Sequence, residues 1–444
     1  MNCHLEDLGP ARKKLNVELP AETVQAELDQ ALQLARKQAR IKGFRPGKVP
    51  LGIIKRMFGA QIEQEVTQKL INDTLPEALN EVKANPVSQA ELEDSSFKAG
   101  EPFRFSLSFD VVPDFEVTGY QGLNLTRERV SLQDEDVDKK LEELRQAYAT
   151  STTVEEDRPL AAGDLAVIEY AAFIDQEPVE GGSNPNYQVE VGSGRFNPEF
   201  EDQLQGLKKD EQKEITVDFP EDHYNPKLAG HKVRFEVKVK DIKEKVLPEL
   251  NDEFAKDLGQ QMESLDQLKD QMRQDLTETE KRRVEGKVKN QLVDKLLELV
   301  DFALPESLVA REIEGMIGNF RFNLKRSGLN PESMGLSETK MRDDYRPEAS
   351  KRVKASLILE KISVDHQLET TEEDIQDRLM EMARETGQPP EMIRQIYNKN
   401  NMMDQLRDSI LTEKTLNFLL QSANIEEVEP QPDETPEADE TNGS

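Results

Sequence analysis

Residues 40–56 read RIKGFRPGKVPLGIIKR, and their composition sets them apart from the rest of the chain. They hold six Lys or Arg and no acidic residue, whereas the 444-residue chain has a formal net charge of −31. Two glycines and two prolines lie within residues 43–50, around Phe44. Glycine permits tight backbone geometry and proline restricts φ. The stretch therefore predicts a stiff, positively charged loop with an aromatic side chain near its middle.

The positive charge extends beyond this loop. Residues 31–60 hold eight basic residues and no acidic one, and a block of this kind indicates an anionic partner, most often nucleic acid. A solvated basic helix face is the alternative. The last residues, 426–444, are the opposite, with eight acidic residues, three prolines and no base, and are expected to be disordered. The basic block consists of Arg36, Lys37, Arg40, Lys42, Arg45, Lys48, Lys55 and Arg56.

Length and composition predict a soluble protein of several domains. Hydrophobic residues make up 36% of the chain, aromatic residues 5%, and Trp is absent, so the cores are expected to be mainly aliphatic. No run approaches the roughly 20 apolar residues of a membrane span, and the first residues lack the apolar core of a secretory signal. The single cysteine, Cys3, fits a reducing cytoplasm. We therefore expect a cytoplasmic protein.

The first hundred residues show the pattern of an α+β unit that ends near Pro113. Leu15, Val17 and Leu19 alternate as in a strand, and residues 21–41 have the apolar spacing of a helix. A second helix is predicted from Pro50 to about residue 83, with a break near Gly59. Residues 103–111, FRFSLSFDV, are predicted to form a strand.

The middle of the chain changes from helical to strand periodicity and back. Residues 131–149 are predicted to be helical, and short strands separated by turns such as EGGSNPN (180–186) follow from Gly163 to about Lys245. After Pro248 the chain is predicted to be almost entirely helical, with a long helix at 265–300 and breaks at 302–307, 327–335 and 386–391. The predicted strands are residues 165–174, 187–191, 214–219 and 233–242, with a short helix at 198–206.

Motifs for cofactor or metal chemistry are absent from the sequence. It contains no GxxxxGK[ST], GxGxxG or HExxH motif and no cysteine cluster. The four histidines are not spaced as metal ligands, so neither a cofactor nor a metal is expected. They are His4, His223, His231 and His366.

The segment GFRPGKVP, residues 43–50, lies between two predicted helices and resembles the signature loop of the trigger factor family. These are bacterial chaperones that meet nascent chains at the ribosomal tunnel exit, and the resemblance covers residues 1 to about 425. It implies an α+β multidomain protein in which a β-rich FKBP-like domain is inserted into a discontinuous all-α substrate-binding domain. The implied segments are a ribosome-binding domain at 1–113, a linker with the first part of the helical domain at 114–160, an FKBP-type prolyl isomerase domain at 161–246, a helical substrate-binding domain at 247–425 and a disordered acidic tail at 426–444.

The resemblance assigns ribosome docking to the loop that contains Phe44. Phe44 would fill a pocket as the apolar anchor, while Arg45 and Lys48 would contact phosphates or acidic side chains. Some family members carry Lys where this chain has Pro46, so either docking is expected to be slightly weaker or Lys42 and Lys48 are expected to carry more of the contact. The implied partners are protein and rRNA of the large ribosomal subunit near the tunnel exit, nascent and unfolded polypeptides, and a second copy of the chain away from the ribosome. The implied docking residues are Gly43, Phe44, Arg45, Pro46, Gly47 and Lys48.

For the middle domain, the resemblance implies an aromatic cup that catalyses rotation about X-Pro bonds. Twisting the amide breaks its resonance, so a dry apolar site favours the transition state without an acid or a base. Three departures, Val179 for an aromatic residue, Asn197 for Ile and Glu199 for Gly, predict reduced activity, partly because an unpaired polar group resists burial. Ordinary core packing is the alternative for each aromatic residue. The implied cup residues are Tyr170, Tyr187, Phe196, Phe200, Tyr224 and Phe235.

Methionines suggest how the helical region meets its clients. Ten of the twelve follow residue 250, and flexible, polarizable Met side chains suit surfaces that accept varied apolar segments, although core packing is the alternative for any single one.

The leading hypothesis is an ATP-independent chaperone that docks on the ribosome and carries a prolyl isomerase domain. The alternatives are a chaperone with a catalytically silent FKBP-like module, a free prolyl isomerase, and an RNA-binding protein that uses residues 31–60. The family is also associated with protein export and cell division.

Overall fold

The computed structural model describes residues 1–430 except 43, 45, 46, 99, 221–227, 229, 260, 261 and 328–336. Backbone contacts group the described residues of 1–125, 289–329 and 336–424 into one compact unit. The described residues of 126–288 and 425–444 form the other.

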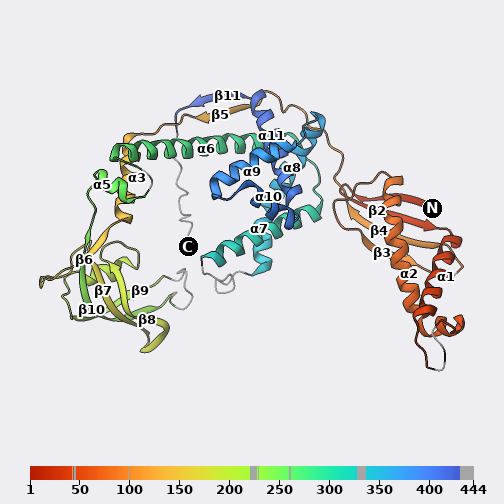
Figure 1. Cartoon of the computed structure of the whole chain (residues 1–444), viewed down its shortest axis with the longest axis horizontal. Helices are drawn as coiled ribbons and strands as arrows, with labels where there is room; N and C mark the ends of the chain where they lie inside the picture. The colour runs from red at the N-terminus through yellow and green to blue at the C-terminus, as the bar shows by residue number, and fades with distance from the viewer. Residues whose placement is uncertain are drawn as a thin grey trace, which may run out of the picture. The chain divides into compact units, whose positions relative to one another are not determined.

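The N-terminal part of the first unit is an antiparallel sheet covered by two helices (Figure 1). Its strands β1 (Asn2–Gly9), β2 (Arg12–Leu19), β4 (Phe103–Asp110) and β3 (Glu91–Ser96) lie in the order β1-β2-β4-β3. The helices are α1 (Ala21–Gln38) and α2 (Leu51–Glu81). The strands predicted around residues 15–19 and 103–111 are confirmed, whereas β1 and β3 were not predicted.

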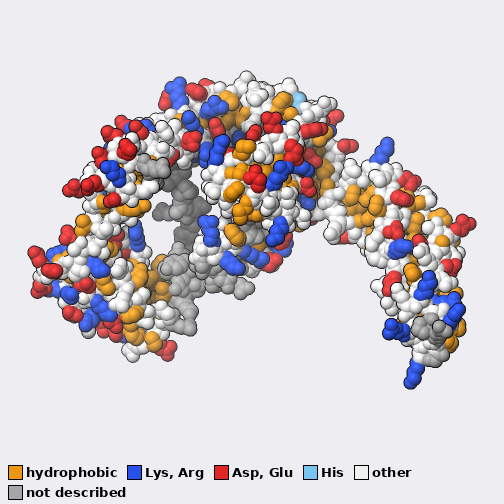
Figure 2. All heavy atoms as spheres, viewed as in Figure 1, with side chains coloured by type: hydrophobic (Ala, Val, Ile, Leu, Met, Phe, Trp, Pro, Cys, Tyr) orange, Lys and Arg blue, Asp and Glu red, His pale blue; other side chains and the backbone are white. Residues whose placement is uncertain are grey.

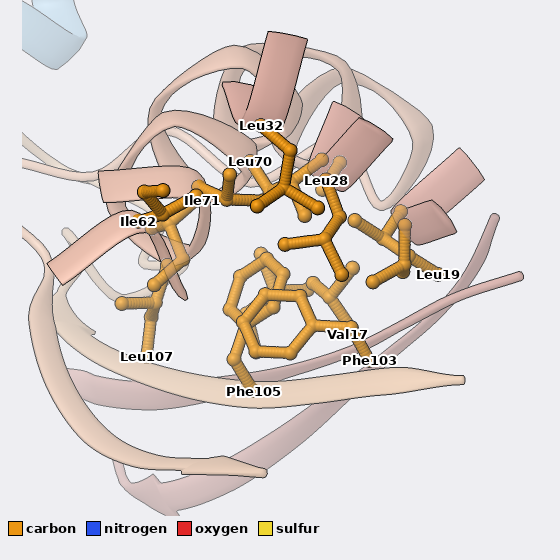
Figure 3. Packing of buried hydrophobic residues seen from close by; sticks show 14 of the residues in the cluster. Val17, Leu19, Leu28, Leu32, Ile62, Leu70, Ile71, Phe103, Phe105 and Leu107 are labelled. Carbon is orange, nitrogen blue, oxygen red and sulfur yellow. The ribbon is translucent and has the colours of Figure 1, made fainter. Parts of the chain in front are cut away.

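The core of this part lies between the sheet and the helices. In the pairing of β2 with β4, Val17 lies opposite Phe105 and Leu19 opposite Phe103, so their side chains share one face of the sheet. Figure 3 shows these residues beneath Leu28 and Leu32 of α1 and Ile62, Leu70 and Ile71 of α2. All of them are buried, which explains why the period-2 and helical patterns of this region predicted its fold well.

The predicted break near Gly59 is wrong. Helix α2 continues from Leu51 to Glu81, through Gly59 and Pro76. Glycine costs a helix about 1 kcal/mol relative to alanine. Here Ile54 on one side of Gly59 and Ile62 and Val66 on the other are buried in the same core. This packing outweighs the local preference of Gly59.

Antiparallel strands of the second unit form the predicted β-rich region. They are β6 (Thr150–Thr153), β7 (Leu165–Ile174), β8 (Glu177–Glu190), β9 (Gln212–Asp218) and β10 (Lys232–Val246), ordered β6-β10-β7-β8 with β9 also paired to β10. The short helix α4 (Pro198–Leu204) is where a helix was predicted. On the buried face, Ile168 lies opposite Val239 and Tyr170 opposite Val237.

The prediction that the segment EGGSNPN forms a turn between strands is wrong. The chain reverses earlier, at Asp175 and Gln176, whose φ values of 47° and 72° fit a two-residue hairpin turn. Strand β8 then runs through residues 180–186, with a bulge where Phe173 pairs with Pro178 but Ala171 pairs with Ser183. The glycine and asparagine residues of this segment thus lie in a bulged strand. The local sequence alone does not distinguish such a bulge from a turn.

The remaining elements are mostly helical, as predicted, and two short strands accompany them. Helix α3 (Asp134–Ala147) precedes the β-rich region, and α5 (Asp252–Asp257) and α6 (Leu265–Leu299) follow it. Strand β5 (Asn124–Glu128) pairs with β11 (Asn424–Val428). The prediction of disorder from residue 426 is therefore wrong for 426–428, which belong to β11, and residues 431–444 lie outside the described residues.

Helices on the two sides of the β-rich region pack on each other. Leu141 of α3 shares a buried cluster with Phe254 of α5 and Leu268 of α6. Glu128 of β5 also binds Arg283 and Lys287 of α6, at 3.1 Å from each. These contacts explain how a helical region can be interrupted in sequence and still be continuous in space.

The C-terminal helices form two further clusters. Helices α7 (Glu306–Arg326) and α8 (Glu338–Asp365) pack through residues that include Ile313, Ile317 and Val353. Helices α9 (Glu372–Thr386), α10 (Pro390–Lys399) and α11 (Met403–Ser422) share a second cluster around Leu379 and Ile410. The break predicted at 386–391 is confirmed. No described helix combines the length and apolar character needed to cross a membrane.

Asp374 joins the start of α9 to α11. Its carboxylate accepts hydrogen bonds from the Thr371 backbone N–H at 2.7 Å and from Lys414 Nζ of α11 at 2.6 Å. The bond from Lys414, followed by those from Thr371, lowers the pKa of Asp374 to about 2. Because an unfolded Asp has a pKa of about 3.9, this contribution to stability is complete above about pH 4 and is lost as the pH falls toward 2.

We expect Asp374→Asn to speed amide exchange in α9 at pH 7, because it removes the ion pair and part of the cap. Below about pH 3 the difference from wild type should shrink, since the wild-type carboxylate is then becoming protonated. Amide exchange in residues 372–386, followed between pH 2 and pH 7 and corrected for intrinsic rates, measures this. Asp377→Asn on the exposed side of α9 is the control. A difference that stays constant with pH would contradict the assignment.

Candidate functional site

Five of the six aromatic residues predicted for the cup lie together in the β-rich region. Tyr170 is on β7, Tyr187 on β8, Phe235 on β10, and Phe200 on α4, while Phe196 lies in the loop before α4. We call these five residues the aromatic cluster. The sixth, Tyr224, lies outside the described residues.

Phe196 is at the centre of the aromatic cluster. Its ring centroid lies 4.6 Å from that of Phe200, 5.4 Å from Tyr187, 5.8 Å from Tyr170 and 6.0 Å from Phe235. These separations and the inclined ring planes are typical of favourable aromatic pairs. A displacement of Phe196 would therefore alter its packing with every other ring of the cluster.

Burial in the aromatic cluster is graded. Phe200 is fully buried and Phe235 is 3% exposed, whereas Tyr170, Tyr187 and Phe196 are only partly buried. Burial, with a smaller contribution from Tyr187, raises the pKa of the Tyr170 phenol above its usual value. Tyr170 is therefore a neutral hydroxyl at physiological pH. The cluster thus presents an apolar surface with polar edges and no ionised group of its own.

The three departures in this region have different surroundings. Val179 packs partly buried against the core of the β-rich region. Asn197 caps α4, because its Oδ1 accepts a hydrogen bond from the Phe200 backbone N–H at 3.0 Å. The expectation of an unpaired polar group at this position is therefore wrong. Glu199 is exposed, so its carboxylate remains hydrated.

Sequence reasoning missed two residues close to the aromatic cluster. Phe219, directly after β9, lies 6.5 Å from Phe235 between ring centroids. Glu201 of α4 is fully buried and accepts hydrogen bonds from the backbone N–H groups of Gly194 and Phe196. An acidic residue in so acidic a chain carries no distinguishing signal, and only the fold shows that Glu201 faces inward.

The predicted docking loop connects α1 to α2. Gly43, Arg45 and Pro46 lie outside the described residues. Phe44 is 40% exposed, and Lys48 is exposed next to Val49, which is fully buried in the core of the N-terminal part. Gly47 has a φ of 78°, which strongly favours glycine. The loop is thus anchored by Val49 while Phe44 remains available at the surface.

Cations around this loop differ from others in the same part of the chain. Among the described residues, none of the seven described members of the basic block forms an ion pair with a carboxylate, and all except Arg36 are exposed. By contrast, Arg12, Lys14 and Lys69 each pair with a glutamate. Figure 2 shows Lys and Arg side chains gathered at the end of α1 and α2 that carries the loop. This end is therefore an exposed positive surface.

The methionines of the C-terminal helices divide between core and surface. Met341 is buried between α7 and α8, and Met382 and Met403 pack in the cluster of α9–α11. Met380 and Met392, by contrast, are 41% and 51% exposed. Core packing thus accounts for Met341, Met382 and Met403, whereas Met380 and Met392 lie at the surface. Within the described part of the chain, no group of three or more His, Cys, Asp or Glu is arranged to hold a metal ion.

Comparison with known families accounts for most of the chain. The model described as bacterial trigger factor protein matches residues 1–144, and that of its C-terminus matches residues 264–421. The chain belongs to the trigger factor family. The model of FKBP-type peptidyl-prolyl cis-trans isomerases matches residues 156–240, between the two trigger factor matches.

Curated trigger factors resemble the chain over nearly its whole length. The protein from Syntrophotalea carbinolica is 36% identical over 97% of both chains, and that from Geobacter sulfurreducens is 35% identical over 96% of this chain and 99% of its own. A solved trigger factor chaperone aligns over 94% of this chain and 99% of its own, with 21% identity and a TM-score of 0.48. The protein is thus a molecular chaperone with the ribosome-binding and FKBP-type domains of trigger factors, as the signature loop predicted.

The different burial of Phe200 and Phe196 predicts different effects of truncation. Phe200→Ala should destabilise the β-rich region by about 3–5 kcal/mol, because it leaves a cavity in a fully buried site. Phe196→Ala should cost clearly less, since Phe196 is only partly buried. Native-state amide exchange of β7 and β10 in the full chain measures both values. Equal losses would contradict the graded burial of the aromatic cluster.

Proposed function

We propose that the aromatic cluster is the active site of a working peptidyl-prolyl cis-trans isomerase. The observation that carries this proposal is the convergence of five aromatic side chains from three strands, a loop and a helix. Rotation about an X-Pro bond has a barrier of roughly 18–20 kcal/mol and loses amide resonance at its top. An apolar environment disfavours the charge-separated planar amide more than the twisted one. No ionised side chain, cofactor or metal is needed for this chemistry.

The surroundings of the departures support activity rather than its loss. Asn197 is engaged in capping α4 and Glu199 is exposed, so neither brings an unpaired polar group among the rings. Val179 supplies a smaller apolar wall than an aromatic residue, which predicts weaker substrate binding more than a loss of rate. A catalytically silent FKBP-like module is the second candidate, and Val179 is the residue that favours it.

Proline-limited refolding of a client protein tests the isomerase. Wild-type protein should accelerate the slow phase, and Phe196→Ala and Tyr224→Ala should remove most of that acceleration. Phe173→Ala is the matched control, because Phe173 lies on β7 beneath Arg234, 5.0 Å from its guanidinium carbon, and outside the aromatic cluster. If wild type gives no acceleration while client aggregation is still suppressed, the domain is a binding module.

We further propose that the loop with Phe44 docks on the large ribosomal subunit near the tunnel exit. The exposed cations that lack ion pairs among the described residues can contact rRNA phosphates, and their charge is not neutralised within the N-terminal part. An exposed phenylalanine beside them suits a pocket in a ribosomal protein. The remaining charge of the chain is strongly negative, which disfavours general binding to naked RNA.

Cosedimentation with ribosomes at moderate salt tests this docking. Phe44→Ala combined with Arg45→Ala should raise the Kd for ribosomes by about tenfold or more and so lower the bound fraction at ribosome concentrations near the wild-type Kd, since hot-spot truncations cost about 2 kcal/mol or more. Phe322→Ala provides the control, because Phe322 of α7 is 66% exposed and lies outside the loop. Unchanged binding of the double variant would exclude the loop as the main contact. Equally tight binding to naked RNA would favour the RNA-binding alternative.

The same proposal places the chain in the cytoplasm, where ribosomes and nascent chains are found. It also includes a homodimer away from the ribosome, which follows from the resemblance alone. Sedimentation velocity of the free protein measures this association.

The exposed Met380 and Met392 are proposed contacts for unfolded clients.

A further inference from the structure

Glu201 is a buried acid that the proposed isomerase chemistry does not use. Its side chain is fully buried, and charged residues are rarely buried without a partner. Among the described residues, Glu201 forms no ion pair with Lys, Arg or His, and the groups that donate hydrogen bonds to it are neutral. A carboxylate in this position must therefore be stabilised by hydrogen bonds alone.

The hydrogen bonds all come from one short loop. Glu201 Oε2 accepts from the Gly194 backbone N–H at 2.7 Å, and Oε1 accepts from the Phe196 backbone N–H at 2.9 Å. The Ser193 hydroxyl lies 3.3 Å from Oε2 and 3.4 Å from Oε1. Gly194 has a φ of 70°, a backbone conformation that lets nearby N–H groups converge. Residues 193–196 thus form an anion-binding loop whose anion is the chain's own Glu201.

This loop also carries the central ring of the aromatic cluster. Phe196 is the residue whose N–H binds Glu201, and its ring contacts the four other members of the cluster. The next residue, Asn197, is fixed separately by its cap on α4. The backbone of Phe196 is therefore held on one side by Glu201 and on the other by the start of α4.

We propose that Glu201 is a positioning residue for prolyl isomerisation, which fixes the backbone of residues 193–196 so that Phe196 completes the aromatic cluster. Glu201 does not touch the substrate in this role. It acts by reducing the conformations open to Phe196 before substrate binds, because sites work best when the side chains that form them are already held in place. The proposal rests on the isomerase function proposed above.

Glu201→Gln is the main test variant. It keeps the size of the side chain, but its amide nitrogen can only donate, so either Gly194 or Phe196 must then face another donor. Asp164→Asn is the matched control, since Asp164 is a second buried carboxylate of the same unit, 5% exposed, bound by Arg158 and the Ala161 N–H. Asp164 does not bind residues 193–196, so its loss reports the general effect of removing a buried charge.

Two measurements on the full-length protein decide the proposal. Amide exchange at Gly194 and Phe196 should rise about tenfold or more in Glu201→Gln, while β10 stays protected. The kcat/KM for a proline-containing peptide should fall about tenfold or more, mainly through kcat, because small displacements of positioned groups carry costs of this size. Asp164→Asn should change neither quantity more than about twofold at a temperature at which it is equally folded.

Several results would overturn the proposal. Unchanged exchange at Gly194 and Phe196 would show that Glu201 does not hold the loop. Faster exchange with an unchanged kcat/KM would show that the loop position does not limit catalysis. Equal losses of activity in Glu201→Gln and Asp164→Asn would show that the loss of activity comes from general destabilisation of the domain.

Further variants keep the test decisive. If Glu201→Gln does not fold, Ser193→Ala takes its place, because Ser193 is exposed and its loss removes only one donor; faster exchange and a smaller fall in kcat/KM are then expected. In Glu201→Ala, formate should restore part of the exchange protection and activity where chloride at the same ionic strength does not. If wild type shows no isomerase activity, the proposed function fails. Amide exchange at Gly194 and Phe196, together with binding of a labelled proline-containing peptide, then still shows whether Glu201 holds residues 193–196 in place.

Discussion

Pairing of β6 with the end of β10 is the constraint on which the second compact unit depends. Thr150 lies opposite Val246 and Thr153 opposite Lys243, so the chain enters and leaves the β-rich region at adjacent positions. The entropic cost of bringing the two ends of an insertion together grows only slowly with its length. The helices that continue from these ends, α3 and α5, then pack on each other and on α6.

The interrupted helical region follows from the adjacency of these two ends. Leu141, Phe254 and Leu268 bury one another although about a hundred residues separate the first from the second. Glu128 binds Arg283 and Lys287 in the same way, from opposite sides of the insertion. The β-rich region and the helices around it can therefore keep separate cores.

Sequence patterns predicted the elements that bury one regular face and missed those that do not. The alternation in β7 and β10 and the apolar spacing of α6 report burial directly, so their positions were predicted closely. Strands β3, β6 and β11 are short, polar and mostly exposed, and they exist only because a partner strand is present. The predictions of a helix break at Gly59 and of a turn at EGGSNPN were wrong for a related reason, because packing and strand pairing with distant residues determine the conformation there.

The same distinction holds for the candidate sites. The aromatic residues and the loop at residues 43–50 are conspicuous in a chain with 5% aromatic residues and a net charge of −31. Glu201 is one of 89 acidic residues, and nothing in its neighbours marks it. Its role depends on the backbone of residues 193–196, which the folded chain alone brings to it.

The adjacent ends of the β-rich region also bear on how such a protein can arise at the level of the gene. Because Thr150 and Val246 are neighbours across two strands, an in-frame deletion of the intervening codons leaves two ends that a short turn can rejoin. The reverse event, insertion of a whole domain into a turn between α3 and α5, is equally simple. The pairing of β6 with the end of β10 thus makes the FKBP-type domain a genetic module that recombination can add or remove in one step.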